Sequence, residues 1–196
     1  MTEWDKIQAG IMYNDFDSDL FKRRVYAKKL FRQYNKTEDN ETELRQAIMT
    51  KLFKSVGKNV WIEPDFKCEY GKNITIENDV YINFGCIILD CAQIFIGANS
   101  LLGPNIGIYA ANHATDAEER INGGCYGKPV SIGKRVWLGG DVKIVGGVSI
   151  GDDTIIGAGS IVTKDIPSGV IAAGNPCRVI RKITENDKTD YLKNKE

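Results

Sequence analysis

The one histidine of this 196-residue chain, His113, lies in a segment that interrupts a regular repeat. An imidazole has an unperturbed pKa of about 6.5, so a histidine can remove a proton from a substrate near neutral pH. Insertions into repetitive folds form loops on one face, which is often the binding face. We therefore expect a general base at His113, in the loop 109–129. The alternative is a solvated surface imidazole.

Other kinds of chemistry lack the residues they need. A zinc site like that of the β-helical carbonic anhydrases requires three histidines around the metal, and each chain carries one. The five cysteines are odd in number and have no C-x-x-C spacing, so we expect small buried hydrophobic residues and no metal site or disulfide framework. They are Cys68, Cys86, Cys91, Cys125 and Cys177.

Charge and hydropathy exclude two further classes of partner. Lys plus Arg and Asp plus Glu number 26 each, so no overall field attracts nucleic acid or an anionic membrane. No apolar run is long enough to span a bilayer, and residues 1–20 contain no apolar signal core. We expect a cytoplasmic protein with a single main domain.

Aliphatic residues recur every six positions through much of the chain. An amphipathic helix repeats near 3.6 residues and a half-buried strand at 2, so neither explains this spacing. These repeat positions are Ile76, Ile82, Ile88 and Ile94, then Ile96, Leu102 and Ile108, and then Ile132, Leu138, Ile144, Ile150, Ile156 and Val162.

A chain that turns a corner after each short strand explains the period of six. Stacked coils of such a chain bury a continuous ladder of aliphatic side chains, so the spacing predicts a β-helix. Glycine follows six of the repeat positions, where we expect it to tolerate the turn geometry. Small or β-branched residues lie four places after a repeat position: Ser100, Val136, Val142, Val148, Thr154 and Ser160.

The first 55 residues have a different pattern. Capping signals predict helices over residues 3–14, from Asp17 or Ser18 onward, and from Thr42 to near Gly57. The second helix has an apolar stripe of Leu20, Val25, Ala27, Leu30, Phe31 and Tyr34. The domain prediction is therefore a helical segment (1–55), a β-helix (56–182) with the inserted loop 109–129, and a tail (183–196).

Several motifs resemble one family over essentially the whole chain. They are IQAGIMYND near the N-terminus, IEPDFKCEYG, NANH with the acidic loop and GKPVSIG, and VIAAGNPCRVIRKI near the C-terminus. The chain is similar to the maltose and galactoside O-acetyltransferases, a group of hexapeptide-repeat acyltransferases. The resemblance implies a mainly β fold: a left-handed parallel β-helix with triangular coils, a small N-terminal helical segment and one protruding loop.

The resemblance also implies a reaction. In that family the histidine, here His113, deprotonates a sugar hydroxyl, which attacks the thioester of acetyl-CoA directly. Asn83 matches an asparagine that stabilises the oxyanion or orients the acceptor; its alternative is a structural asparagine of a β-helix turn. Open alternatives are a non-catalytic β-helix scaffold and an acetyltransferase for serine or an antibiotic. No metal is implied.

The remaining site residues come from the same resemblance. Asp15, Arg24, Tyr81 and Cys125 are expected at the acceptor, although a helix cap and a surface charge would also explain the first two. The galactoside type has two adjacent aspartates where this chain has Asp90 and Cys91, so the acceptor class stays open. Expected acetyl-CoA contacts are Trp137, Gly140, Ala158, Thr163, Lys164, Arg178 and Arg181. The family forms homotrimers, which predicts sites between subunits and a loop 109–129 that reaches a neighbour.

Overall fold

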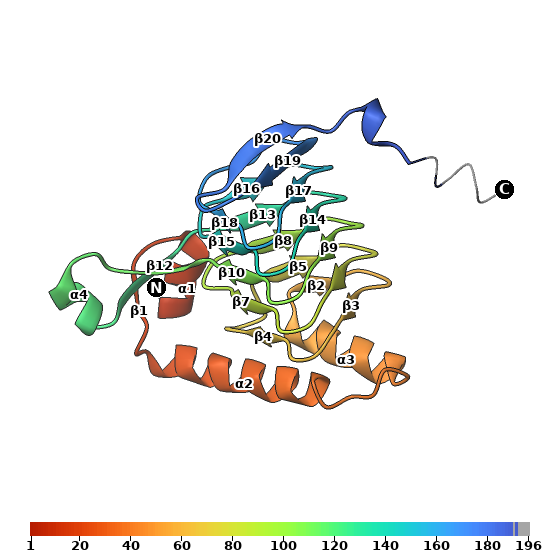
Figure 1. The fold of residues 1–196 in the computed structure, drawn as a ribbon. Coiled ribbons are helices and arrows are strands. Elements are labelled where there is room, and N and C mark those ends of the chain that lie inside the picture. Colours follow the sequence, from red (N-terminus) through yellow and green to blue (C-terminus); the bar gives the residue numbers. More distant parts are fainter. Residues whose placement is uncertain (190, 192–196) are drawn as a thin grey trace.

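A computed structural model describes residues 1–189 and 191, and the coils of a β-helix make up most of it (Figure 1). Three parallel sheets form the sides of the coils. The seven-stranded sheet contains β3 (Trp61–Ile62), β6 (Tyr81–Ile82), β9 (Leu101–Leu102), β14 (Trp137–Leu138), β17 (Ile155–Ile156), β19 (Val170–Ala173) and, antiparallel at its edge, β20 (Arg178–Lys182).

The other two sides have five strands each. We call the first the β10 sheet, after its central strand, and the second the β8 sheet. The β10 sheet contains β4 (Lys67–Cys68), β7 (Ile87–Leu89), β10 (Gly107–Tyr109), β15 (Lys143–Val145) and β18 (Ile161–Val162). The β8 sheet contains β2 (Ser55–Val56), β5 (Ile74–Ile76), β8 (Ile94–Ile96), β13 (Val130–Ile132) and β16 (Ser149–Ile150).

The repeat positions form the core, as their spacing predicts. All of them are at most 2% exposed, and each pairs in register with the same position of a neighbouring coil, as Leu102 does with Leu138. The residues four places later are buried as well. All five cysteines are buried and free, which confirms their predicted place. The period of six therefore reports an inward side chain on each side of a coil, and the β8 sheet adds a second one, since Ile94 and Ile96 of one strand are both buried.

The glycines after the repeat positions have a different role from the expected one. None of the six has a positive φ, so turn geometry does not require them. A Cβ on Gly139 would lie 2.6 Å from the backbone nitrogen of Ala158 in the next coil. Left-handed residues lie three places after a repeat position instead, for example Asp141 (φ 61°) and Gly159 (φ 70°). Close stacking of coils, rather than the turn, therefore excludes a side chain after each repeat position.

Three helices precede the coils, two of them shorter than predicted. Helix α1 is Glu3–Ala9, α2 is Ser18–Tyr34 and α3 is Thr42–Leu52. The predicted extension of α1 to residue 14 is wrong because Gly10 ends it in the left-handed region and the chain then forms a strand. The predicted extension of α3 toward Gly57 is also wrong, since that segment pairs in the β8 sheet.

Capping and burial support the rest of the helical prediction. Thr2 and Asp5 form the expected capping box, and Asp17 caps α2 through the backbone N–H groups of its first turn. The stripe of α2 is buried except at Val25, which is 50% exposed and was wrongly placed in it. Helices α2 and α3 pack on each other at the lower end of the coils (Figure 1).

The interrupting segment is a hairpin rather than an irregular loop. It contains β11 (Ala111–His113), the short helix α4 (Ala117–Ile121) and β12 (Gly124–Gly127), and it projects from the coils (Figure 1). Strand β12 also pairs with β1 (Tyr13–Asn14) of the N-terminal segment, so that β1, β12 and β11 form a three-stranded antiparallel sheet. This sheet joins the two parts of the chain for which the sequence predicts acceptor contacts.

At the C-terminal end, β20 folds back on β19 and is followed by a 3-10 turn, η1 (Glu185–Asp187). The predicted tail, residues 183–196, lies partly outside the described residues. None of the helices in the described part of the chain is long and apolar enough to cross a membrane.

Candidate functional site

The three-stranded sheet places His113 beside the N-terminal segment. His113 lies at the end of β11, directly opposite Cys125 of β12, and Cys125 is in turn opposite Tyr13 of β1. The sheet emerges at the corner between the β10 and β8 sheets, which we call the acceptor corner. Three segments distant in sequence therefore meet around one imidazole.

The imidazole has one protein partner within the described residues. Cys125 Sγ lies 2.9 Å from Nδ1 of His113, and the His113 side chain is otherwise exposed. Burial raises the pKa of the Cys125 thiol to about 11, so the sulfur is a neutral thiol near pH 7. The second ring nitrogen, Nε2, thus faces outward with no bond from the described chain. Cys125 was expected to line the acceptor pocket, and the structure places it behind the histidine, only 4% exposed.

Asp15 and Arg24 form an ion pair at the same corner. Nη1 of Arg24 donates to Asp15 Oδ1 at 2.6 Å, and Nη2 donates to the Asp15 carbonyl oxygen at 2.7 Å. Nη1 also lies 3.2 Å from the hydroxyl of Tyr70, which belongs to the coil. The two residues are therefore neither a helix cap nor an isolated surface charge. They join the N-terminal segment to the β-helix, with the Asp15 side chain still 31% exposed.

Glu69 is a member of this cluster that the sequence reasoning missed. Its carboxylate lies 3.7 Å from Nε of Arg24, and its side chain is 25% exposed. Burial raises the pKa of Glu69, Arg24 lowers it and Asp15 raises it further. Glu69 also raises the pKa of Cys125, which locates it near the partner of His113. Its position within the quoted motif IEPDFKCEYG was the available signal.

Asp90 and Cys91 have structural roles at this corner. Asp90 is fully buried and accepts hydrogen bonds from the backbone N–H groups of Glu69 and Tyr70 at 3.0 and 2.8 Å, and of Asn73 at 3.2 Å. Burial raises its pKa to about 7, against the effect of these donors. Cys91 is buried against Tyr13 and offers no carboxylate to an acceptor.

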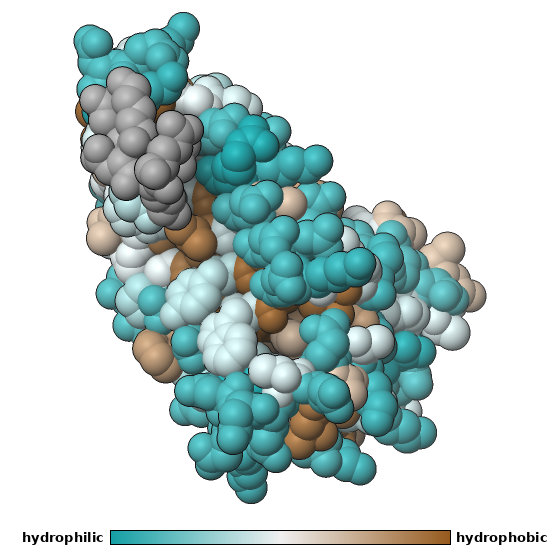
Figure 2. Space-filling model, turned by 90° about the vertical axis from the view of Figure 1, so that its right-hand side faces the viewer, coloured by the Kyte–Doolittle hydropathy of each residue, from teal (hydrophilic) through white to brown (hydrophobic). Residues whose placement is uncertain are grey.

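A second group of predicted residues lies on the seven-stranded sheet. Tyr81, Leu101, Trp137 and Ile155 pair in register along its outer face, and the row continues through Ile171 to Arg181. Leu101 and Trp137 are each about half exposed. Figure 2 shows hydrophobic side chains exposed among hydrophilic ones along the stacked coils, on the side to the right in Figure 1. The Tyr81 hydroxyl donates to Glu63 on this face, so Tyr81 is not part of the cluster around Arg24.

The other predicted cofactor contacts occupy two different corners. Gly140 and Ala158 follow β14 and β17, at the corner between the seven-stranded and β10 sheets, and Gly140 accepts the N–H of Gly159 from the next coil. Thr163 and Lys164 follow β18 and are exposed at the acceptor corner, above His113 in the stack.

The two predicted arginines differ in the partners that the described chain already gives their guanidinium groups. Arg178 is exposed and donates to the adjacent carbonyl oxygen of Cys177. Arg181 forms a two-pronged ion pair with Asp187 at 2.8 and 2.6 Å, and this pair lowers the pKa of Asp187. Arg181 can thus contact a phosphate only if it shares or exchanges this partner.

Asn83 is distant from His113 in the same chain. It lies in the turn after β6, before β7, where its Oδ1 accepts the N–H of Phe84 at 2.7 Å. Asn83 therefore lies at the corner where the strands of the β10 sheet begin. His113 follows β10, a strand of the same sheet, and so lies at the corner where these strands end. A strand of three residues and its two turns separate the corners, a span of more than about 10 Å. Asn83 and His113 of one chain therefore cannot contact the same reacting atom.

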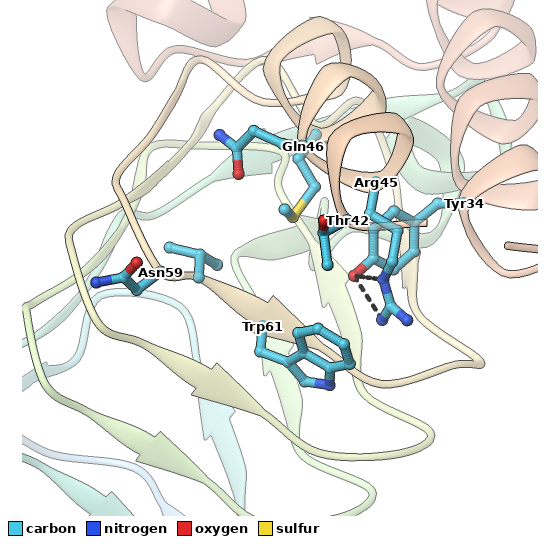
Figure 3. Close-up of a pocket in the computed structure, with 8 residues that line it drawn as sticks. Tyr34, Thr42, Arg45, Gln46, Asn59 and Trp61 are labelled. Atoms are coloured by element: carbon cyan, nitrogen blue, oxygen red, sulfur yellow. Dashed lines mark hydrogen bonds between the residues drawn. The ribbon is translucent and has the colours of Figure 1, made fainter. Parts of the chain in front are cut away.

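One well-defined pocket lies elsewhere, between α3 and the first coil (Figure 3). It has a volume of about 380 Å³, and Arg45 lies among its lining residues. Arg45 donates to the Tyr34 hydroxyl, the Ile62 carbonyl oxygen and Asp39, and it stacks on Trp61. Since these partners satisfy the buried guanidinium, the pocket offers no free charge for catalysis.

Comparison with known proteins identifies the family. A family model described as the maltose acetyltransferase hexapeptide capping motif matches residues 6–57, and one for the bacterial transferase hexapeptide (six repeats) matches residues 129–164. Galactoside O-acetyltransferase of Escherichia coli (strain K12) is 44% identical over 193 residues, which cover 98% of this chain and 94% of that protein. The chain belongs to the maltose and galactoside O-acetyltransferase family.

Solved structures of this family have the same fold. A maltose O-acetyltransferase from Clostridium difficile superposes with a TM-score of 0.91 at 49% identity, covering 94% of this chain and 99% of that one. A galactoside acetyltransferase in complex with coenzyme A has a TM-score of 0.91 at 42% identity, covering 97% and 96%. As a member of the maltose and galactoside O-acetyltransferase family, the protein is an O-acetyltransferase with a parallel β-helix fold.

Proposed function

We propose that the protein transfers the acetyl group of acetyl-CoA directly to a hydroxyl of a sugar or glycoside, with His113 as general base. One observation carries the proposal: an exposed imidazole, held at Nδ1, lies beside a half-buried Asp15–Arg24 pair. Carboxylate and guanidinium groups suit the recognition of vicinal hydroxyls. That a relative was solved with coenzyme A supports the donor.

The histidine must present an unprotonated nitrogen to the acceptor. Since Nδ1 faces Cys125, the base is Nε2, and Nδ1 must carry the proton and donate it to the sulfur. Cys125 thus positions the ring and selects its tautomer. The opposite assignment, with the thiol donating to Nδ1, would leave Nε2 protonated and unable to act.

The reaction then proceeds in two balanced steps. Nε2 takes the proton of the acceptor hydroxyl while the oxygen attacks the thioester carbonyl carbon, giving a tetrahedral oxyanion. The oxyanion collapses, the carbon–sulfur bond breaks, and the imidazolium returns its proton to the departing thiolate. General-base assistance of this type contributes about 10²–10⁴ in rate. The free amide N–H₂ of Asn83 suits stabilisation of the oxyanion.

Asn83 must come from a second chain, because the two corners of one chain are too far apart. We propose a homotrimer in which the acceptor corner of one chain meets the seven-stranded sheet of its neighbour. The exposed hydrophobic residues on both sides support such a contact: Ile11, Met12, Phe16 and Ile121 near the acceptor corner, and Phe84, Leu101 and Trp137 on the sheet side. The hairpin 109–129 projects from the coils, and we expect it to reach a neighbour in the trimer (Figure 1).

Acetyl-CoA fits the groove that such a contact would form. Its pantetheine arm would follow the backbone at Gly140 and Ala158 of one chain and at Thr163 of its neighbour, with Trp137 beside the thioester. Lys164, Arg178 and Arg181 would contact the phosphate-bearing end, since cations pair strongly with phosphate oxygens. Five free cysteines suit a reducing cytoplasm.

The test is release of free thiol from acetyl-CoA with a panel of glucosides, galactosides, maltose, serine and chloramphenicol. Release that depends on a sugar supports the proposal. Release only with serine or chloramphenicol would show that the acceptor is one of these compounds and not a sugar. The absence of release with every compound would favour the non-catalytic scaffold.

A further inference from the structure

Glu69 places a carboxylate at the acceptor corner, and the neighbouring residues do not fully neutralise its negative charge. Two carboxylates, Asp15 and Glu69, share the guanidinium of Arg24. Arg24 bonds closely with Asp15, at 2.6 Å, whereas Glu69 stays at 3.7 Å. At that distance Arg24 and Glu69 form no hydrogen bond, and the Glu69 side chain accepts none from the described part of the chain, so its oxygens remain available to a ligand.

No other cation compensates Glu69 by direct contact among the described residues. Lys28 is the second cation that acts on Glu69 electrostatically, and it lines a separate hollow together with Asp65 and Lys67. The buried Tyr70 and the thiols of Cys91 and Cys125 bring no positive charge. The raised pKa of Glu69 agrees with a carboxylate that lacks full compensation.

The position of Glu69 directs this charge toward the acceptor. It acts electrostatically on Cys91, Cys125 and Arg24, all at the acceptor corner, and Cys125 contacts the imidazole. Glu69 follows β4 at the corner where the strands of the β10 sheet end, and at this same corner β10 leads into β11 and His113. We expect a sugar whose hydroxyl reaches Nε2 of His113 to place its other ring substituents near Glu69. A positively charged substituent at that point would complete the ion-pair set.

We propose that Glu69 makes the acceptor site selective for amino sugars, with the protonated amine of the acceptor paired to this carboxylate. The selectivity rests on the proposed function, acetyl transfer to a sugar hydroxyl. It concerns binding of the acceptor, and the acetyl group still goes to oxygen, because a protonated amine has no lone pair with which to attack the thioester.

The test compares methyl glucoside with methyl 2-amino-2-deoxyglucoside at a pH where the amine is protonated. The readout is the ratio of their kcat/KM values, measured by thiol release at saturating acetyl-CoA. In the wild type we expect the amino sugar to be preferred. Glu69→Gln keeps the shape and removes the charge, and it should lower the ratio about tenfold. Glu69→Lys should lower it further.

The matched control is Glu43→Gln, the same change at an exposed residue of α3, which should leave the ratio unchanged. A ratio that is the same in the wild type and Glu69→Gln would overturn the inference, even if overall activity falls. No thiol release from the wild type with either sugar, or with the wider panel, would instead overturn the proposed function on which the inference rests.

Discussion

The stacked coils and the three-stranded sheet that interrupts them hold their residues in place by different means. In the coils, each inward residue packs on its equivalent one coil away, and the environment repeats. In the three-stranded sheet, β1, β12 and β11 come from two distant segments and meet only once. The regular part supplies a rigid frame, and the irregular part collects dissimilar groups such as an imidazole, a thiol and an ion pair. Catalytic chemistry needs that dissimilarity, which a repeat cannot provide.

The largest expected effect lies in the irregular part. His113→Ala should lower kcat about 10²–10⁴-fold, because in the proposed mechanism the acceptor loses its general base. Binding of acetyl-CoA, measured by calorimetry, should change little, and so should the melting temperature, since the side chain is exposed. A variant that keeps turnover close to the wild-type value would remove His113 from the mechanism.

Substitutions in the stacked coils should instead lower the stability of the fold. Gly139→Ala places a methyl group 2.6 Å from the backbone of the next coil and should cost about 1–3 kcal/mol. The comparison variant is Gly159→Ala, where no atom lies within 4 Å but φ is +70°, which should cost about 1 kcal/mol. Urea unfolding at one fixed protein concentration measures both. If Gly139→Ala costs no more than Gly159→Ala, coil stacking does not explain the glycines after the repeat positions.

Cys125 sharpens the comparison because it is a buried residue to which we assign a chemical role, that of positioning the imidazole. Cys125→Ala should lower kcat about three- to tenfold by removing the acceptor for Nδ1–H, with little effect on KM for acetyl-CoA. Cys125→Ser keeps an acceptor atom and should restore most of the loss. The pH profile of kcat should differ between the Ala variant and the wild type. Equal activity of all three proteins would show that the sulfur only fills space.

The smallest effect concerns the Arg181–Asp187 pair at the end of the coils. The pair lowers the pKa of Asp187, so its stabilising effect is complete above the ordinary carboxyl pKa and is lost as the pH falls below it. Because the pair is exposed, we expect only a slight decrease in the melting temperature on acidification. Asp187→Asn should remove that slight dependence. An identical pH dependence in both proteins would contradict this assignment.

The sequence predicted the frame well because one physical rule, a regularly spaced inward side chain on each coil side, fixes the repeat positions. Ile94 is an additional inward residue on the same strand as Ile96. The sequence predicted the wrong reason for the glycines after the repeat positions, because the distance between stacked coils cannot be inferred from residue spacing along the sequence. The ends of α1 and α3 were missed for a similar reason. Both segments leave the helix to pair with strands that are distant in sequence.

Motifs in the sequence named the candidate residues of the site but not their arrangement. His113, Asp15 and Arg24 were identified from motifs, and the structure brings them to one corner. That Cys125 lies behind the imidazole depends on the pairing of β12 with β11. That Glu69 adds a second carboxylate depends on the place of β4 in the β10 sheet. Such contacts across the chain have no local sequence pattern.

The most direct test of the central claim, a site shared between two chains, is complementation between two inactive variants. His113→Ala and Asn83→Ala chains with different tags are coexpressed, and the mixed assemblies are isolated and assayed for thiol release. If neighbouring chains contribute the two residues, each mixed cyclic trimer regains one intact site among its three interfaces, and the activity of the isolated mixed assemblies returns to about a third of the wild type. Activity no higher than that of the separate variants would contradict the account.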